Sequence, residues 1–243
     1  MFLSKLELNG ARRGTGRLLA SPQRMHAAVA ASFPAEDAVD AAGAGARILW
    51  RVDAGSHNPV VYVVSPETPD FTHIVEQAGW PTKVSWGVAD YAPLLDRLAE
   101  GQVWQFRLAA NPVHNVAGAR GTRGKRVPHV TAAHQEEWLL GKADQIGAAF
   151  DVESPLPGST DSETGSASSA PSFRIEERKV VRFARRKPAN GKVAKTVTIT
   201  QARFDGLLRV TDPESLRKAL VQGIGPAKGY GCGLLTLAPV PRS

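Results

Sequence analysis

The chain has 243 residues, of which 30 are Lys or Arg and 23 are Asp or Glu, and its formal net charge is +7. This length predicts one large domain or two small ones, and a hydrophobic content of 42% excludes a chain that is disordered throughout. No apolar run reaches the ~18 residues of a membrane-spanning helix, and the start, MFLSKLELNG, lacks the pattern of a secretory signal. Cys232 is the one cysteine. An internal disulfide and a zinc site built on paired cysteines are therefore excluded, and we expect a reducing, cytoplasmic setting.

The first part of the chain predicts a strand, a helix, two strands, a helix and a strand, in that order. Apolar alternation predicts the first strand over residues 1–8. Ser21 and Pro22 are typical of a helix start, and apolar residues at helical spacing follow as far as Pro34. Further segments are strand-like at 47–52, 59–64 and 83–88 and helical at 72–78. This β-α-β-β-α-β order is that of a ferredoxin-like domain.

The same order is expected to repeat in the second part of the chain. Strands are predicted at 103–109, 173–184, 195–204 and 233–238, and helices at 131–150 and 213–221. Residues 154–172 are rich in Ser, Gly, Pro and Thr and predict a disordered loop. We therefore predict an α+β chain of two tandem ferredoxin-like (RRM-like, βαββαβ) domains, residues 1–98 and 102–243. The duplication rests on element order alone.

The positive charge lies in one short segment, residues 174–195. This segment holds two acidic residues and nine basic ones, and the remaining 21 basic residues are balanced by 21 acidic ones. A solvated surface run is the ordinary interpretation of such a segment. A cluster of one sign with little nearby to balance it favours a phosphate-binding surface instead. The basic residues are Arg174, Arg178, Lys179, Arg182, Arg185, Arg186, Lys187, Lys192 and Lys195.

A glycine run near the C-terminus is the most specific local feature. Residues 223–233 read GIGPAKGYGCG and contain five glycines and Lys228. A Walker loop needs Ser or Thr after its lysine, but here Gly229 follows Lys228. A dinucleotide fingerprint lies between a strand and a following helix, but here the predicted helix comes before the run. One interpretation is a tight turn packed against the sheet. The other is a phosphate path lined by Lys228 and by backbone N–H groups.

His26 is the candidate for acid–base chemistry. It lies near the start of the helix predicted after Ser21, close to Arg24. The partial positive charge at a helix N-terminus favours a neutral imidazole and attracts phosphate. A neutral imidazole beside a phosphate can act as a general base, and its protonated form as a general acid. Spacing alone leaves a surface histidine as the alternative.

Other polar clusters carry weaker signals. Three further histidines lack metal-ligand spacing and are expected to be structural or surface residues; they are His114, His129 and His134. A second basic patch is expected to be a flexible loop over a polyanion or simply solvated, and it comprises Arg120, Arg123, Lys125 and Arg126. The absence of paired carboxylates near a metal-type motif argues against a two-metal nuclease.

Several stretches resemble one known family. They are FLSKLELN, SPQRMHAAVAASFP, VWQFRLAANPV with GKRVPHVTAAHQEEWL, and FDGLLRVTDPESLRKALVQGIGPAKGYGCGLLTLA. With them the chain resembles the CRISPR repeat-RNA endoribonucleases of the type I-E Cascade complex, which are CasE-type members of the RAMP superfamily. The resemblance runs from one end of the chain to the other. It implies two tandem ferredoxin-like domains, in agreement with the predicted element order.

The resemblance also implies a function. It implies that the protein binds the hairpin of CRISPR repeat RNA, in precursor and mature form, and cuts the precursor at the base of the stem. It implies no metal and no cofactor, attack by the RNA 2′-hydroxyl, a 2′,3′-cyclic phosphate product, and a place among the other Cascade subunits, with no membrane partner. A non-cleaving subunit that binds an RNA stem-loop is the alternative, and a DNA-binding module is a third hypothesis.

The resemblance assigns roles to particular residues. By its place in the SPxxMH stretch, His26 corresponds to the family's acid–base histidine. Several members have a tyrosine where this chain has Gln23, and an amide cannot exchange a proton near neutral pH, so the partner of His26 stays open. The basic segment corresponds to a hairpin that enters the deep major groove of the RNA stem. RNA-binding residues are expected to be Arg24, Arg178, Arg182, Arg185, Arg186, Lys187, Lys192, Gly223, Gly225, Lys228 and Gly229.

Overall fold

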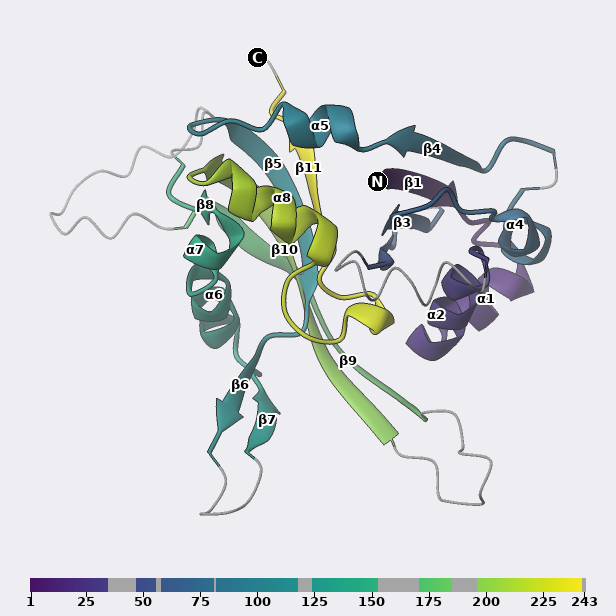
Figure 1. Ribbon diagram of the computed structural model, residues 1–243. Coiled ribbons are helices and arrows are strands. Elements are labelled where there is room, and N and C mark those ends of the chain that lie inside the picture. The colour runs from purple at the N-terminus through teal and green to yellow at the C-terminus, as the bar shows by residue number, and fades with distance from the viewer. Residues whose placement is uncertain are drawn as a thin grey trace, which may run out of the picture.

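The computed structural model describes residues 1–34, 47–55, 58–80, 82–117, 124–152, 171–184 and 196–241. In these segments the strands form two main sheets, with helices packed against them, and one two-stranded hairpin (Figure 1). Among the described residues, no helix combines the length and the apolar character needed to cross a membrane.

The first sheet has the strand order of a ferredoxin-like domain. Its order is β2-β3-β1-β4, with every neighbouring pair antiparallel. The strands are β1 (Phe2–Glu7), β2 (Leu49–Asp53), β3 (Val60–Ser65) and β4 (Trp86–Asp90). The helices are α1 (Arg13–Leu19), α2 (Pro22–Ala30) and α4 (Thr72–Ala78). A buried cluster that includes Leu6, Met25, Val29 and Trp50 joins α2 to this sheet.

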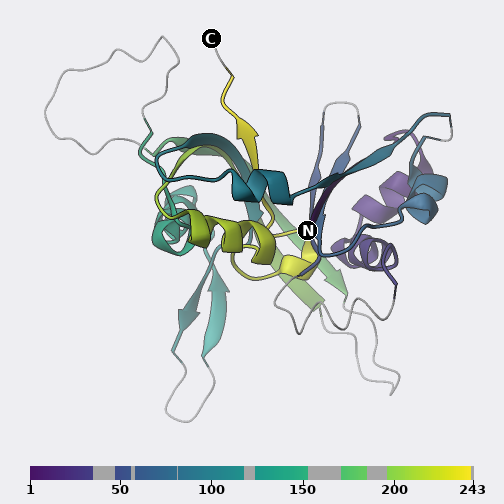
Figure 2. The ribbon, with the colours of Figure 1, turned by 45° about the horizontal axis from the view of Figure 1, so that its top comes forward.

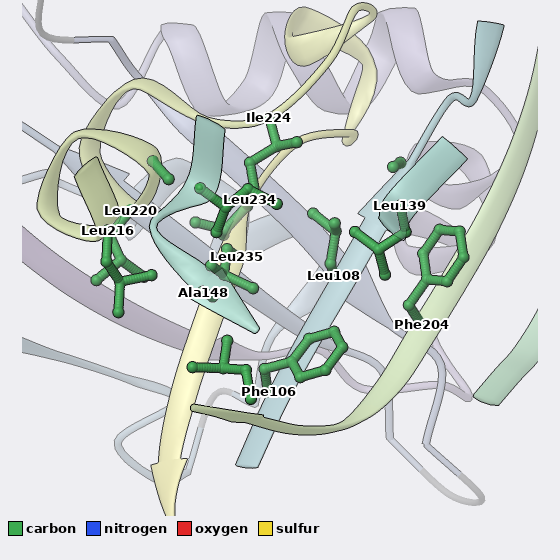
Figure 3. Close-up of a cluster of buried hydrophobic side chains, with 14 of the residues drawn as sticks. Phe106, Leu108, Leu139, Ala148, Phe204, Leu216, Leu220, Ile224, Leu234 and Leu235 are labelled. Atoms are coloured by element: carbon green, nitrogen blue, oxygen red, sulfur yellow. The ribbon is translucent and has the colours of Figure 1, made fainter. Parts of the chain in front are cut away.

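The second sheet has the equivalent strand order, β11-β5-β10-β9, with β9 and β10 longer than the other strands. Its path is β11-β5-β10-β8, and β9 also pairs with β10. Its strands are β5 (Val103–Ala110), β8 (Ala148–Ala149), β9 (Phe173–Ala184), β10 (Thr196–Val210) and β11 (Leu235–Pro239). Helices α6 (Ala132–Leu140), α7 (Ala143–Ile146) and α8 (Pro213–Gln222) accompany it, and a separate hairpin, β6 (Val113–Val116) with β7 (Lys125–Pro128), follows β5. Phe106, Leu108 and Phe204 lie in its core (Figure 3).

The largest core crosses from one half of the chain to the other. It contains Leu49, Val64 and Tyr91 from the first half together with residues of β5, β10 and α8. Helix α5 (Ala92–Asp96) joins β4 to the segment that leads into β5. The α+β class with two ferredoxin-like sheets agrees with the sequence prediction. The division of the chain into domains 1–98 and 102–243 stays a prediction, and the shared core means that the halves do not pack independently.

Several sequence predictions of single elements were wrong in extent. The helix predicted over 131–150 ends at Leu140, and Gly147, with a φ of 74°, separates α7 from β8. Strand β10 continues past residue 204 to Val210, and β4 begins at Trp86 rather than at residue 83. The structure adds α1, α5 and the β6–β7 hairpin, part of which had been predicted as a flexible loop. Of the loop predicted at 154–172, all but Pro171 and Ser172 lies outside the described residues.

Candidate functional site

His26 lies on α2, the helix predicted from Ser21 and Pro22. Pro22 occupies the first helical position, while the Ser21 side chain makes no capping hydrogen bond. Met25 and Val29, four residues apart, are buried against the first sheet, so His26 stands at the edge of the buried stripe and is itself half-buried. Desolvation by this burial lowers the pKa of His26. A lowered pKa favours the neutral imidazole near neutral pH, and burial is the cause of this shift.

The glycine run folds into a loop that faces His26. After α8 the chain forms a single 3-10 turn, η1 (Lys228–Tyr230), which contacts α2 and appears as the short yellow turn between the two halves in Figure 2. The Tyr230 ring lies 6.3 Å from the His26 ring, centroid to centroid, at an interplanar angle of 64°. A Cβ added to Gly229 would lie 3.7 Å from Cε1 of His26. Residues from opposite ends of the chain thus meet at one imidazole.

Tyr230 is a residue of this site that the sequence analysis missed. Its ring packs edge-to-face against Phe183 of β9, with 4.8 Å between centroids. Left-handed residues bracket η1, namely Ala227 with a φ of 64° and Gly231 with a φ of 78°. Since a residue with a side chain rarely adopts positive φ, this turn is shaped to hold Tyr230 between Phe183 and His26. An aromatic residue among glycines was the only sequence signal.

Packing accounts for four of the five glycines in residues 223–233. Gly223, Gly225, Gly231 and Gly233 all have positive φ, and an added Cβ would lie 2.9 Å from Leu49 at Gly223 and 3.0 Å from Trp138 at Gly225. The interpretation as a tightly packed turn therefore fits Gly223 and Gly225, which lie against side chains of the core. The interpretation as a phosphate path is left with Gly229, the glycine beside His26. RNA binding by any of the three stays a prediction.

Lys228, Arg24 and Gln23 lie in the same region. The Lys228 ammonium group donates a hydrogen bond to the backbone oxygen of Gln222 at 2.7 Å, which satisfies a carbonyl at the end of α8. Burial, with the charge of Arg47, lowers the pKa of Lys228. Arg24 is exposed, and its Nη1 donates to the backbone oxygen of Arg17 at 3.3 Å. Gln23 is half-buried one helical turn before His26.

The basic segment is a two-stranded ribbon whose faces differ. On β9, Val181 and Phe183 lie on the face that packs against Ala227 and Tyr230. Arg178 and Arg182 lie on the other face because side chains alternate along a strand. Both are exposed, but Arg178 already donates from Nε to Oε1 of Gln135 at 3.0 Å and also to the backbone oxygen of Val130.

Arg178 therefore ties β9 to α6, a structural role that the sequence analysis did not foresee. Residues Arg185, Arg186, Lys187 and Lys192 lie outside the described residues, so their RNA-binding role stays a prediction.

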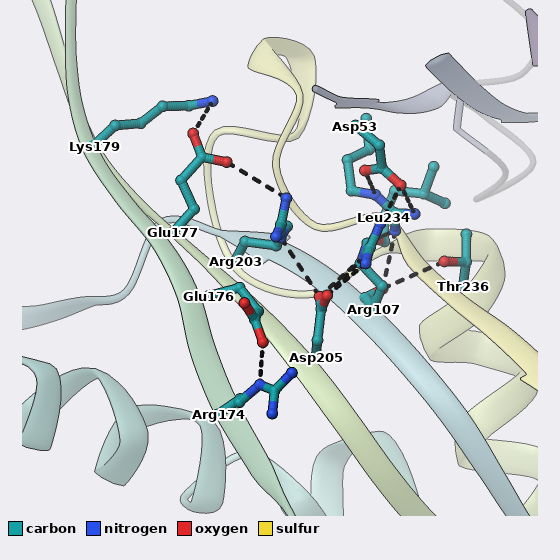
Figure 4. A network of polar contacts seen from close by, with 11 residues as sticks. Asp53, Arg107, Arg174, Glu176, Glu177, Lys179, Arg203, Asp205, Leu234 and Thr236 are labelled. Atoms are coloured by element: carbon teal, nitrogen blue, oxygen red, sulfur yellow. Dashed lines mark hydrogen bonds and ion pairs between the residues drawn. The ribbon is translucent and has the colours of Figure 1, made fainter. Parts of the chain in front are cut away.

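A network of charged side chains joins the first sheet to the second (Figure 4). Arg51 is fully buried, forms a two-pronged ion pair with Asp53 (2.7 and 3.1 Å), and donates to the backbone oxygens of Arg107 and Leu234. Arg107 in turn binds Asp53 at 3.0 Å and Asp205 at 2.5 Å. Burial alone would raise the pKa of Asp53, but hydrogen bonds from Arg51 and Arg107 and their charges hold it below its usual value. The network fixes β2 of the first sheet to β5, to β10 and to Leu234, the residue before β11.

Comparisons with known proteins agree with this arrangement. A family described as CRISPR associated protein matches residues 1–239. The CRISPR-associated endoribonuclease Cse3 of Thermus thermophilus is 32% identical over 98% of this chain and 100% of its own length. The Cascade subunit CasE of Escherichia coli is 31% identical over 79% of this chain and 89% of its own length.

A solved structure of Cse3 bound to a 19-nucleotide RNA superposes with a TM-score of 0.71 at 31% identity, covering 98% of this chain and 100% of that one. From the family match over nearly its whole length and these two relatives, the chain belongs to the family of CRISPR-associated proteins that includes Cse3 and CasE.

Proposed function

We propose that this protein is an endoribonuclease that binds the hairpin of CRISPR repeat RNA and cuts the precursor at the base of the stem. The observation that carries the proposal is the meeting of His26, kept neutral by burial, with the Gly229–Tyr230 turn, whose tyrosine packs against the basic ribbon. The relatives named endoribonuclease Cse3 and Cascade subunit CasE, matched over most of the chain, support this assignment.

His26 is the proton acceptor of the proposed reaction. The neutral imidazole takes the proton of the RNA 2′-hydroxyl, whose oxygen attacks the adjacent phosphorus and forms a new P–O bond. The bond from phosphorus to the 5′-oxygen breaks, and this oxygen leaves with a proton delivered by the imidazolium or by solvent. The products are a 2′,3′-cyclic phosphate and a 5′-hydroxyl. The nucleophile belongs to the RNA and the proton acceptor to the protein, so the reaction needs no metal.

In this proposal the basic ribbon binds the RNA stem. Deep, narrow major grooves of A-form RNA offer phosphates and shape rather than base edges. Arg182 on the exposed face of β9 is suited to such phosphates, with Arg24 on α2 at the His26 end. Fixed positive groups near the phosphorus stabilise the extra negative charge of the transition state. By likeness to the Cascade subunit CasE, the protein is expected to assemble with the other Cascade subunits and to hold the mature RNA as well as the precursor.

The decisive experiment follows cleavage of labelled repeat RNA in EDTA. The wild-type protein is expected to cut the RNA once and to leave a 2′,3′-cyclic phosphate, which acid opens to a mixture of 2′- and 3′-phosphates. His26→Ala is expected to slow cleavage by about 10²- to 10⁴-fold, the range for general acid–base catalysis, with RNA affinity retained. His73→Ala is the control: it removes a half-buried histidine of α4 whose Nε2 lies 3.0 Å from the backbone oxygen of Ala28 on α2, so it tests whether loosening α2 slows cleavage while the imidazole of His26 is kept.

Two outcomes would contradict the proposal. Uncut RNA bound tightly by the wild-type protein would favour the alternative, a non-cleaving stem-loop-binding subunit in which Gln23 marks a lost site. Cleavage that EDTA abolishes would overturn the metal-free mechanism while leaving the endoribonuclease assignment in place.

A further inference from the structure

The β6–β7 hairpin presents an unusual cluster of imidazoles near its base. The rings of His114 and His129 are 4.7 Å apart, centroid to centroid, and those of His129 and His134 are 5.8 Å apart. His114 lies on β6, His129 follows β7, and His134 is in the first turn of α6, where its backbone N–H donates to Oγ1 of Thr131. Among the described residues no group of three or more histidine, cysteine and acidic side chains is placed to hold a metal ion.

The strand register places a lysine on the same face of the hairpin. His114 pairs with Val127 and Val116 pairs with Lys125, and directly paired residues share a face while neighbours along a strand alternate. His114, Lys125 and Val127 therefore lie on one face, together with His129, whose ring contacts His114. Arg126, paired with Asn115, lies on the opposite face. The face with the histidines is called the histidine face below.

The histidine face has no acid of its own. The segments 113–117 and 124–130 contain no aspartate or glutamate. The nearest charged groups come from elements packed against it, namely Glu136 and Glu137 on α6 and Arg178 on β9, whose guanidinium is already bonded to Gln135 and to the backbone oxygen of Val130. Burial and the charges of His114 and His134 lower the pKa of His129, and the charge of Glu137, which acts in the opposite direction, offsets this only in part.

Arg178 also links the histidine face to the basic ribbon. One of its bonds connects β9 to Gln135 of α6, and the other connects β9 to Val130 in the segment between β7 and α6. The hairpin and the outer end of the β9–β10 ribbon extend from the same side of the molecule (Figures 1 and 2). Arg182 shares its face of β9 with Arg178. An RNA held on that face of the ribbon would thus run toward the hairpin.

We propose that His114, Lys125, His129 and His134 form a second surface that binds the phosphodiester backbone of the repeat RNA. This inference rests on the proposed function and extends the RNA contact beyond the basic ribbon. The charges of His114 and His134 disfavour protonation of His129 in the free protein, and a phosphate beside the His129 ring removes that penalty. The bound protein therefore holds more protons than the free protein, and by linkage the affinity rises as the pH falls.

The test measures binding of repeat RNA that carries a 2′-deoxy nucleotide at its cleavage position, in EDTA, at several salt concentrations. Lys125→Gln is expected to raise Kd by about two- to fivefold, the range for an exposed ion pair. It is also expected to reduce the slope of log Kd against log salt by about 0.7–0.9, the value for one lost phosphate contact. Arg126→Gln removes the same charge from the opposite face one residue away, and is expected to leave both quantities unchanged.

The pH arm uses His129→Gln. The wild-type protein is expected to bind the RNA more tightly at about pH 6 than at about pH 8, and His129→Gln should reduce this ratio, whereas Arg126→Gln should not. Thermal melting of each variant checks that the hairpin substitutions leave the fold intact.

The outcomes separate this inference from the proposed function. If the wild-type protein neither binds nor cuts the repeat RNA, the proposed function itself is wrong. If the wild-type protein binds and cuts, but Lys125→Gln and His129→Gln retain its Kd, salt slope and pH ratio, the histidine face binds no RNA and this inference alone is wrong. Normal RNA binding combined with loss of assembly into the Cascade complex would assign the face to a protein partner and would likewise overturn it.

Discussion

The two halves of the molecule contribute to the candidate site in different ways. The first half supplies one imidazole from a regular helix, placed by Met25 and Val29 in the buried stripe of α2. The second half supplies an irregular turn held by positive φ and by Phe183. A helix is positioned by its apolar stripe, whereas such a turn is positioned only by what surrounds it. The site therefore depends on how firmly the two halves are joined.

The largest effect on stability is expected from replacing Arg51, which joins the two halves. Its side chain is 2% exposed, and Arg51→Met leaves the partly buried Asp53 with only Arg107. Removing one partner of a buried ion pair typically costs about 3–5 kcal/mol, so the free energy of unfolding should fall by about that amount. Urea unfolding followed by fluorescence measures it.

Arg209→Met is the matched control for Arg51→Met. It breaks an arginine–aspartate pair on the surface, in which Nη2 of Arg209 donates to both carboxylate oxygens of Asp151 and the side chains are 40% and 54% exposed. Such pairs contribute at most about 1 kcal/mol. Equal losses in the two variants would mean that the Arg51 network does not hold the halves together.

The next largest effect, on the rate and pH dependence of cleavage, is expected where the two halves meet at the Tyr230 and His26 rings. Tyr230→Leu admits water to the imidazole, so the lowered pKa of His26 should rise toward its ordinary value of 6.5. With His26 acting as a base, the loss of cleavage on acidification should then begin at a higher pH. A misplaced imidazole should also slow cleavage, by up to about 100-fold. Single-turnover rates against pH measure both effects.

Tyr230→Phe is the matched control, because it keeps the ring and removes the hydroxyl. It should retain the wild-type pH profile. If Tyr230→Phe lost as much cleavage rate as Tyr230→Leu, the hydroxyl rather than the ring would be the important group. That hydroxyl would then be the proton-exchanging partner of His26, a role that the amide of Gln23 cannot fill. A pH profile unmoved in both variants would mean that Tyr230 does not position His26.

Much of the fold was predictable because it follows periodicity. Strand β1, helix α2 and helix α8 agree with sequence patterns that depend on neighbours along the chain. Helix α1 was missed because it contains Gly14 and Gly16, which disfavour helices. At Gly14 a Cβ would collide with the backbone of Gln77, so that glycine reflects the close approach of α4, which no local pattern contains.

The candidate site was predictable in part for the same reason. His26 lay in a recognisable helix, but Tyr230 faces it only because the chain brings its two ends together. The positive charge of residues 174–195 indicated a ribbon but not which arginine would be engaged: Arg178 binds α6 and Arg182 stays exposed. Local sequence patterns predict the helices and strands, whereas the contacts between them depend on tertiary packing.

The smallest effect separates the two roles of the glycine loop. Gly231 has a φ of 78°, and an added Cβ would lie 2.7 Å from Trp50, so Gly231→Ala should lower the free energy of unfolding by about 1–3 kcal/mol. At Gly229 an added Cβ would meet His26 at 3.7 Å, an ordinary van der Waals contact. Gly229→Ala should therefore change stability by no more than about 0.5 kcal/mol.

Cleavage rates complete the comparison between these two glycines. Because the extra methyl at Gly229 lies beside the imidazole without displacing it, the Gly229→Ala rate should stay within about threefold of wild type, a change of less than about 1 kcal/mol in the barrier. A much larger loss with unchanged stability would mean that the space between Gly229 and His26 is occupied by the RNA during the reaction. The same loss with lowered stability would instead place Gly229 with the four glycines that packing requires.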